Sequence, residues 1–147
     1  MSLKETLNND IKAAMKAKDK ETLAVLRMIK TAVQAAEIDK KEELNPEEEL
    51  TILAREAKQR RESLAEFVKA GRDELVAKTE AEIEIVERYL PKQLSVEEVK
   101  EVIATVAEKI GATTQKEFGK LMGAVMQELK GKADGNVIKE QVKAHLG

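Results

Sequence analysis

The sequence predicts an all-α protein, and three observations indicate this class. Residues that favour helices dominate the composition, and only 2% of the residues are aromatic. Apolar residues make up 42% of the chain, and they recur every three to four positions, which is the spacing of one helix face. Runs of β-branched residues with period two, which would indicate strands, are missing. We therefore expect seven helices and no sheet.

The first two helices are predicted from apolar stripes at helical spacing. One helix is expected near residues 3–16. Asp19 is a suitable N-cap for the second, because its side chain can accept hydrogen bonds from free backbone N–H groups. The stripe of this second helix runs from Leu23 to Ala36 and fades in the charged segment 39–43.

The third helix has a strong start signal at residues 45–46, where an asparagine cap and a proline precede three glutamates. We expect this helix to end at Gly71. A fourth helix, roughly 73–89, cannot continue through Pro91, which lacks a backbone N–H. Four long helices with short links predict an up-and-down bundle, or a set of antiparallel hairpins, over residues 1–90.

Shorter helices follow a hinge at residues 90–95, and we expect them to form a small three-helix domain over 91–147. Ser95 and Glu98 form a capping box that starts the fifth helix, and Gly111 ends it.

The last two helices are predicted from the same kinds of signal. The sixth helix is expected between Thr114, a suitable cap, and Gly131, a stop. Either Asp134 or Asn136 caps the seventh.

Composition excludes several classes of protein. The chain has no cysteine, and no apolar run approaches the roughly 20 residues needed to span a bilayer, so no membrane association is expected. The N-terminus lacks the apolar core of a signal peptide, so a cytoplasmic location is the default expectation. The net charge is only −2, so any site for nucleic acid must be a local one.

Catalytic motifs are also missing. The chain has one histidine, His145, and no glycine-rich phosphate-binding motif, so we predict no catalytic residue, no metal site and no cofactor. Two interpretations remain open for the basic segment 55–62. It is either a patch that faces phosphates or a solvated face with i,i+4 ion pairs such as Lys58 with Glu62. We favour ion pairing, because acidic residues interleave with the basic ones.

Two glycines in the sixth helix require an explanation. Gly119 and Gly123 are four residues apart, and each glycine costs about 1 kcal/mol relative to alanine in a helix. Close approach of another helix or of a ligand backbone would explain them, and Lys116 and Lys120 lie beside them at i,i+4 spacing. The alternative is that the glycines only pack.

The turn after the sixth helix is the second feature of this region. Lys130 and Lys132 bracket Gly131, which allows a left-handed backbone, and Gly135 follows. The turn opens toward the N-terminus of the last helix, where free N–H groups favour anions. Residues 113–147 hold six lysines and four acidic residues, a local excess of +2. The alternative is that Gly131 is simply a helix stop and that Lys130 complements the helix dipole.

Four segments, 23–28, 58–63, 89–95 and 119–135, resemble the GatB/YqeY family, specifically its small standalone members, and the match spans essentially the whole chain. The resemblance implies a four-helix part followed by a three-helix part similar to the tail domain of the B subunit of glutamine-dependent aminoacyl-tRNA amidotransferase. In that enzyme the tail holds tRNA, and the catalytic centres lie in other domains. The elements shared with the tail are here Gly119, Lys120, Gly123, Met126, Lys130, Gly131, Lys132 and Ala133.

The resemblance therefore implies an accessory module that binds tRNA or another RNA through Lys116, Lys120, Lys130 and Lys132, around Gly119, Gly123, Gly131 and Gly135. One alternative is a protein-interaction adaptor whose partner meets Phe118, Met122 and Met126. The other alternative is a participant in a carbon–nitrogen ligase reaction, with glutamine as the amido-nitrogen donor and the catalytic centres on other subunits.

Overall fold

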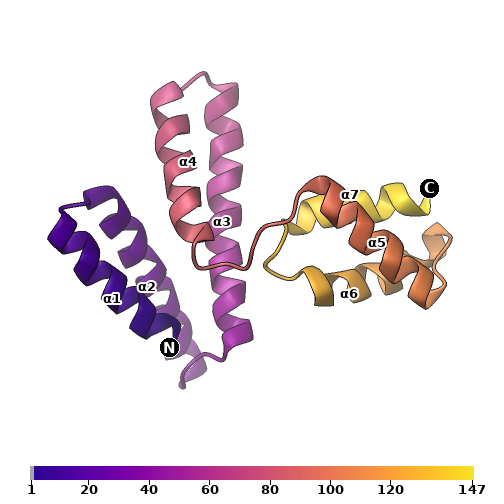
Figure 1. The fold of residues 1–147 in the computed structure, drawn as a ribbon, viewed down its shortest axis with the longest axis horizontal. Helices are drawn as coiled ribbons and strands as arrows, with labels where there is room; N and C mark the ends of the chain where they lie inside the picture. Colours follow the sequence, from indigo (N-terminus) through magenta and orange to yellow (C-terminus); the bar gives the residue numbers. More distant parts are fainter. Residues whose placement is uncertain (1) are drawn as a thin grey trace. The chain divides into compact units, whose positions relative to one another are not determined.

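The computed structural model describes residues 2–147 and confirms the all-α class, with no strand among these residues (Figure 1). The chain divides into two compact units, which meet in sequence between Leu90 and Pro91. The first unit holds α1 (Leu3–Ala17), α2 (Lys20–Lys40), α3 (Pro46–Lys69) and α4 (Asp73–Glu87). The second holds α5 (Val96–Ile110), the 3₁₀ turn η1 (Gln115–Glu117), α6 (Phe118–Leu129) and α7 (Gly135–Leu146).

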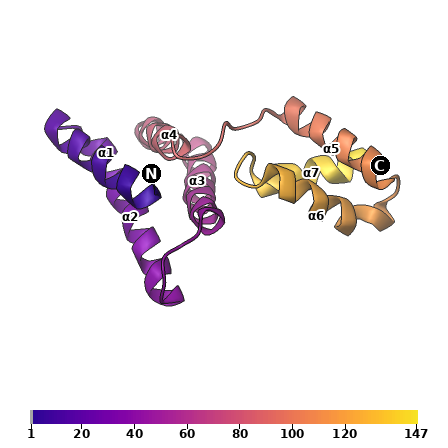
Figure 2. The same ribbon diagram turned by 60° about the horizontal axis from the view of Figure 1, so that its bottom comes forward.

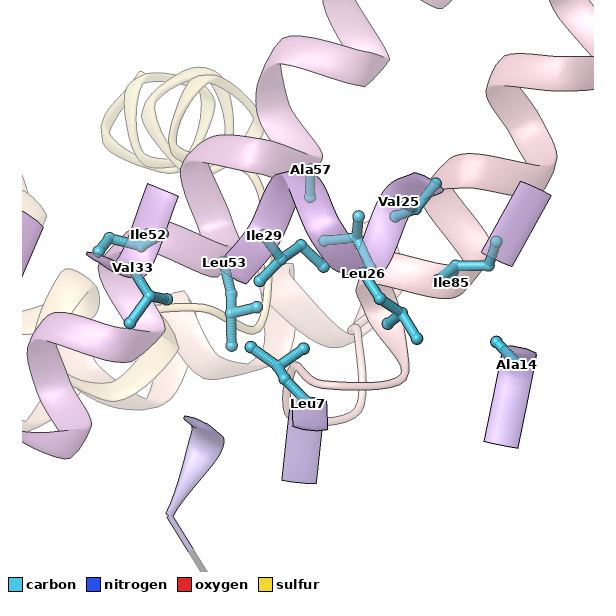
Figure 3. Packing of buried hydrophobic residues seen from close by; sticks show 11 residues of the cluster. Leu7, Ala14, Val25, Leu26, Ile29, Val33, Ile52, Leu53, Ala57 and Ile85 are labelled. Atoms are coloured by element: carbon cyan, nitrogen blue, oxygen red, sulfur yellow. The ribbon is translucent and has the colours of Figure 1, made fainter. Parts of the chain in front are cut away.

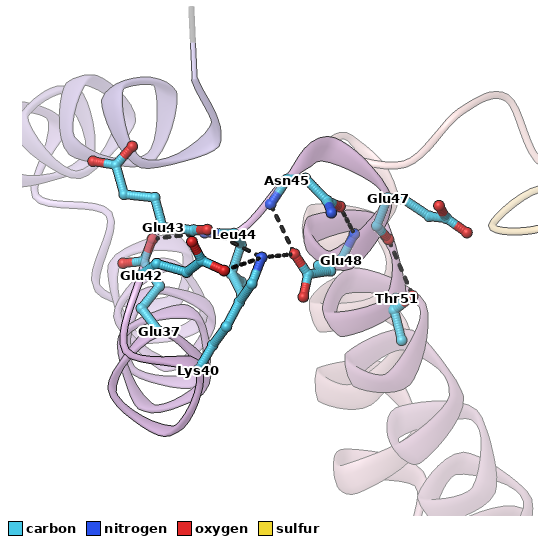
Figure 4. Close-up of polar contacts among 9 residues, drawn as sticks. All are labelled: Glu37, Lys40, Glu42, Glu43, Leu44, Asn45, Glu47, Glu48 and Thr51. Carbon is cyan, nitrogen blue, oxygen red and sulfur yellow. Dashed lines mark hydrogen bonds and ion pairs between the residues drawn. The ribbon is translucent and has the colours of Figure 1, made fainter.

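The predicted caps determine where most helices begin. The Asp19 side chain accepts the Thr22 N–H at 3.1 Å, and Asn45 and Glu48 form a reciprocal capping box at the start of α3 (Figure 4). A second capping box joins Ser95 and Glu98 at the start of α5.

Two boundaries differ from the expectation. Helix α4 ends at Glu87 rather than near Tyr89. Helix α6 begins at Phe118, because a 3₁₀ turn occupies the residues after Thr114.

The first unit consists of two antiparallel hairpins, α1–α2 and α3–α4 (Figure 1). Figure 3 shows that α2 directs Val25, Leu26, Ile29 and Val33 toward residues from the other helices. Burial of an apolar side chain contributes about 1.5–3 kcal/mol, so this shared cluster holds the hairpins together. A polar tie adds to it, because the Tyr89 hydroxyl donates a hydrogen bond to the Asp10 carboxylate of α1.

The second unit has its own core, to which α5, α6 and α7 each contribute one stripe. Figure 2 shows these three helices packed side by side. The buried stripe of α6 consists of Leu121, Val125 and Leu129, at the i,i+4 spacing of one helix face. Phe118, Met122 and Met126 are half-buried and pack against the same core. These three residues therefore contribute to packing inside the unit rather than forming an open methionine surface for a partner.

Candidate functional site

The four candidate lysines lie in two pairs at opposite ends of α6. Lys116 is in η1 and Lys120 is in the first turn of α6, whereas Lys130 caps the C-terminal end of the helix and Lys132 follows in the turn. Helix α6 has 12 residues, and at 1.5 Å per residue it is about 18 Å long. The structure therefore brings the lysines together in pairs and does not gather all four into one cluster.

Three of the four lysines have no charged partner. Lys116, Lys120 and Lys132 are exposed, and within residues 2–147 no carboxylate oxygen lies within 4.0 Å of their ammonium nitrogens. Lys130 differs, because it is half-buried and already interacts with another group of the chain. The three unpaired ammonium groups are available to an external anion.

The glycines of α6 face open space. A Cβ atom built on Gly119 or Gly123 would meet nothing within 4 Å, and both residues are exposed. No helix of the described chain approaches them, so internal packing does not explain why these positions lack a side chain. They leave bare helix backbone beside Lys116 and Lys120.

The turn after α6 has the left-handed conformation expected of its glycine. Gly131 has φ +77° and is buried, and it stops the helix directly after Lys130. Gly135 is the first residue of α7, and its φ is not positive.

The N-terminus of α7 carries its own carboxylate. The Asp134 side chain accepts the Asn136 N–H at 2.8 Å, so Asp134 is the cap. Its negative charge competes with any external anion at this helix end. The expectation that the turn opens toward an anion-binding helix terminus is therefore weakened by the chain itself.

The segment that precedes α5 holds this turn in place. The Leu94 N–H donates to the Lys132 carbonyl oxygen at 2.8 Å, and the Gln93 side-chain amide donates to the Gly131 carbonyl oxygen at 2.7 Å. The same Gln93 amide also donates to the Pro91 carbonyl oxygen at 3.0 Å. Segments 89–95 and 119–135, which both carry the family resemblance, are thus in direct contact in the second unit.

A groove of about 550 Å³ opens at this contact. We call it the lysine groove, and its lining residues are Lys92, Leu94, Val102, Gln127, Glu128, Leu129 and Lys132. Lys92 and Lys132 are exposed, and Lys92 also has no carboxylate within 4.0 Å among residues 2–147. Leu94, Val102 and Leu129 give the groove an apolar part, so it can accept an anionic group together with a flat or apolar one.

Sequence reasoning missed Lys92, because the segment around it was interpreted only as a hinge. The available signal was its position beside Pro91, within a segment that carries the family resemblance. No spacing rule pairs Lys92 with Lys132, because 40 positions separate them in the sequence and only the fold brings both to one groove.

The basic segment of α3 forms ion pairs, but not the solvated face that was expected, since no Lys58–Glu62 pair occurs within residues 2–147 and the central arginine is buried. Arg60 is buried and contacts Glu56 at 2.8 Å and Glu82 of α4 at 3.2 Å. Arg61 contacts Glu87 at 3.0 Å. These arginines join α3 to α4 and are not available to phosphates.

The structure contains no group of three or more potential metal-ligating side chains within residues 2–147. No helix in that range has the length and hydropathy required to cross a membrane. His145 is exposed in the last turn of α7.

Fold and site together define an all-α protein whose small C-terminal unit exposes unpaired lysines at both ends of one helix. The chain belongs to the YqeY-like protein family, because the sequence model of that family matches residues 4–146. This match confirms the resemblance seen in the four segments.

Three curated relatives share the name "Altered inheritance of mitochondria protein 41, mitochondrial". The protein from Kluyveromyces lactis is 32% identical over 139 residues, covering 94% of this chain and 72% of the relative. That from Candida glabrata is 29% identical over 141 residues, covering 95% and 75%. That from Pyrenophora tritici-repentis is 26% identical over 144 residues, covering 96% and 79%.

The expectation of a cytoplasmic location is wrong, because these relatives are named as mitochondrial proteins. An N-terminus without an apolar core lacks only the mark of a secretory signal peptide. Mitochondrial targeting segments are amphipathic and rich in arginine, and they need no such core. The missing apolar stretch therefore carried no information about this destination.

Proposed function

We propose that the second unit is an RNA-binding accessory module with tRNA as its ligand. In this proposal residues 91–147 correspond to the three-helix tail of the amidotransferase B subunit, and residues 1–90 form a separate four-helix unit. The observation that carries the proposal is the set of exposed lysines without carboxylate partners, in a chain whose net charge is −2. A local cluster of positive charge raises the concentration of anions near it, so it favours an anionic partner at this surface.

The geometry favours a long polyanion over a mononucleotide. Lys116 and Lys120 lie at one end of α6 and Lys132 lies at the other, about 18 Å away by helix rise. A ligand that contacts both ends must present phosphates over this distance, as a folded RNA does.

The bare backbone at Gly119 and Gly123 supports the same interpretation. A sugar–phosphate chain can approach α6 closely between the two ends, because no side chain stands in the way. Such contacts read shape and phosphate positions rather than base sequence, and they depend strongly on salt.

The lysine groove supplies the second element. Lys92 and Lys132 sit beside the apolar surface of Leu94, Val102 and Leu129. An unstacked base together with its phosphate satisfies both kinds of surface, because bases have an apolar face. We therefore place a single-stranded or looped part of the RNA at this groove and a helical part along α6.

A salt titration tests the proposal. Binding of a labelled tRNA is measured by fluorescence anisotropy between low and physiological salt. If Lys92, Lys116, Lys120 and Lys132 each neutralise one phosphate, the slope of log K against log salt lies between about −2.8 and −3.6. We expect Lys92→Glu with Lys132→Glu to lower the affinity at least tenfold and to reduce the magnitude of the slope by about two.

The matched control changes two exposed lysines of α1, Lys12→Glu and Lys16→Glu, which alter the net charge by the same amount. This variant should keep most of the affinity. Equal losses in the two variants would mean that only the overall charge matters, and affinity independent of salt would contradict phosphate contacts.

A further inference from the structure

The outer face of α2 carries an apolar stripe that no helix of the first unit covers. We call it the α2 stripe, and its members, all exposed, are Ala24, Met28, Thr31, Ala35 and Ile38. They are spaced alternately four and three residues apart, which is the repeat of a coiled-coil seam. The opposite face of the same helix supplies Val25, Leu26, Ile29 and Val33 to the core (Figure 3). Helix α2 is thus apolar on two faces. The core uses one of them, and on the other the Met28 sulfur accepts a hydrogen bond from Arg60 of α3 at 3.5 Å while 54% of Met28 stays exposed.

The stripe is the site of two of the molecule's surface hollows. Met28, Thr31 and Ala35 line one hollow, which Glu56 of α3 borders. Ile38 lines the other, next to Glu42 and Glu43. Ile38 is 75% exposed and Met28 is 54% exposed, values that are high for large apolar side chains. A continuous exposed stripe with hollows along it indicates an interface rather than isolated surface residues.

The two ends of α2 carry opposite charges. Residues 20–30 include three basic residues and one acidic residue, a net +2. Residues 37–43 include four acidic residues and two basic ones, a net −2. Within this end Lys40 pairs with Glu42 and with Glu48 of α3 (Figure 4), and Lys4 of α1 pairs with Glu37 and Glu43. The side chains of Glu42 and Glu43 remain 68% and 86% exposed, so they can still meet a basic partner.

This distribution identifies the partner. A partner helix of uniform charge would match one end of the stripe and repel the other. A second copy of α2 in the antiparallel direction matches both ends, because each +2 end then meets a −2 end. Antiparallel pairing of identical surfaces is the two-fold arrangement found in most homodimers.

The sizes of the side chains agree with the same alignment. In an antiparallel pair centred near Thr31, Ile38 lies opposite Ala24 of the copy, and Met28 lies near Ala35 of the copy. Each large side chain therefore meets a small one. We propose that this protein self-associates through the α2 stripe as an antiparallel two-fold dimer.

The stripe spans 15 residues of one helix, a length of about 21 Å. An interface of this size is at the small end of the range for specific complexes, so we expect a weak dimer whose population depends on concentration. The proposal does not depend on RNA binding, and its test uses full-length protein freed of nucleic acid.

Sedimentation equilibrium over a wide concentration range provides the measurement. We expect the average mass to rise above the monomer mass of 16.3 kDa as concentration increases. Ile38→Glu should raise the dissociation constant at least tenfold, because it places a charge in the apolar seam. Circular dichroism should show an unchanged helix content, since Ile38 is 75% exposed and makes no core contact.

The chain offers a closely matched control. Met15 and Met28 are both 54% exposed, but Met15 is on α1, away from the stripe. Met28→Glu should weaken the dimer, and Met15→Glu should leave its dissociation constant within twofold. Equal effects of these two variants would overturn the proposal, as would a monomer at concentrations up to about 1 mM.

A charge-swap experiment tests the antiparallel orientation. Lys20→Glu with Arg27→Glu makes both ends of α2 acidic, and Glu42→Lys with Glu43→Lys makes both ends basic. Each variant alone should dimerise more weakly than the unaltered protein. A mixture of the two should recover heterodimers, because every acidic end then meets a basic end. Failure of the mixture to associate would contradict the antiparallel pairing. If the unaltered protein is a monomer and Ile38→Glu changes its affinity for RNA, the stripe belongs to the RNA-binding surface and the dimer proposal is wrong.

Discussion

The two units of this chain treat their charged side chains in different ways. In the first unit, Arg60 and Arg61 join α3 to α4 through glutamates, and Lys40 ties the end of α2 to the start of α3. In the second unit, Lys116, Lys120 and Lys132 have no such partner among the described residues. Exposed lysines without a carboxylate partner among residues 2–147 also occur in the first unit, for example Lys12, Lys16 and Lys58. The contrast therefore lies between charges that join two helices and charges that stay at the surface, and only the latter are open to a ligand.

The largest expected effect is a loss of folding stability when the ion-pair network of the first unit is broken. Arg60→Ala leaves Glu56 and Glu82 without their partner, and the side chains of these glutamates are only 15% and 21% exposed. Removal of one member of a buried ion pair typically costs about 3–5 kcal/mol. Urea unfolding should show this loss, whereas Lys58→Ala, at an exposed position of the same helix, should stay within about 0.5 kcal/mol. A loss below about 1 kcal/mol for Arg60→Ala would mean that water already screens the network.

A smaller effect concerns the polar tie between α1 and the end of α4. Burial and the hydrogen bond to Asp10 raise the pKa of Tyr89. A raised folded-state pKa means that the tie stabilises the fold below the ordinary tyrosine pKa of about 10 and loses this contribution as pH rises. Tyr89→Phe should lower the free energy of unfolding by about 1–2 kcal/mol at neutral pH. The stability of this variant should then fall less at high pH than that of the unaltered protein.

The absorbance of tyrosinate reports this pKa directly, because Tyr89 is the only tyrosine of the chain. The control variant Asp10→Asn should lower the pKa toward its ordinary value. Ionisation of Tyr89 at the ordinary pKa in the unaltered protein would contradict the tie.

A third prediction separates stability from binding in the second unit. A Cβ at Gly123 meets no atom within 4 Å, so Gly123→Ala should stabilise α6 by about 0.5–1 kcal/mol. If α6 receives an RNA backbone, the same substitution should lower RNA affinity. Gly111→Ala is the control, because its φ of +71° makes alanine unfavourable and the substitution should destabilise the unit. Unchanged RNA affinity in Gly123→Ala would remove the proposed reason for the glycine.

The smallest expected effect is a difference in salt dependence between the capping glutamates of the two units. The hydrogen bond from Lys40 lowers the pKa of Glu48, whereas backbone and side-chain hydrogen bonds from Ser95 lower the pKa of Glu98. Lowered pKa values mean that each cap stabilises its helix above about pH 4.3 and loses this contribution as pH falls further.

Salt should distinguish the two caps. Salt should weaken the contribution of Glu48, because an ion pair is screened, and should leave that of Glu98 nearly unchanged. Acid unfolding of Glu48→Gln and Glu98→Gln at two salt concentrations checks the difference. An equal response to salt would contradict it.

The helices could be predicted from the sequence because their signals are local. Asn45 with Glu48, Ser95 with Glu98 and Gly111 each act within one helical turn. The site could be predicted only in part. Lys116 and Lys120 were visible as neighbours in sequence, but the contact between the segments around Gln93 and Gly131 depends on the tertiary fold.

The α2 stripe was hidden from sequence reasoning for another reason. The predicted stripe from Leu23 to Ala36 includes residues of both faces, because apolar residues on two faces of one helix look like a single broad face. Burial in the structure separates the two faces, since Met28 is exposed while Ile29 is fully buried.

The hydrogen bond from Leu94 to the Lys132 carbonyl has a practical consequence for dissecting this protein. A fragment that begins at the first residue of α5, Val96, would keep all three helices of the second unit and still lose the donors that hold the turn after α6. Such a fragment could fold and yet give a false negative for ligand binding. Cloning boundaries should therefore be set at or before Pro91.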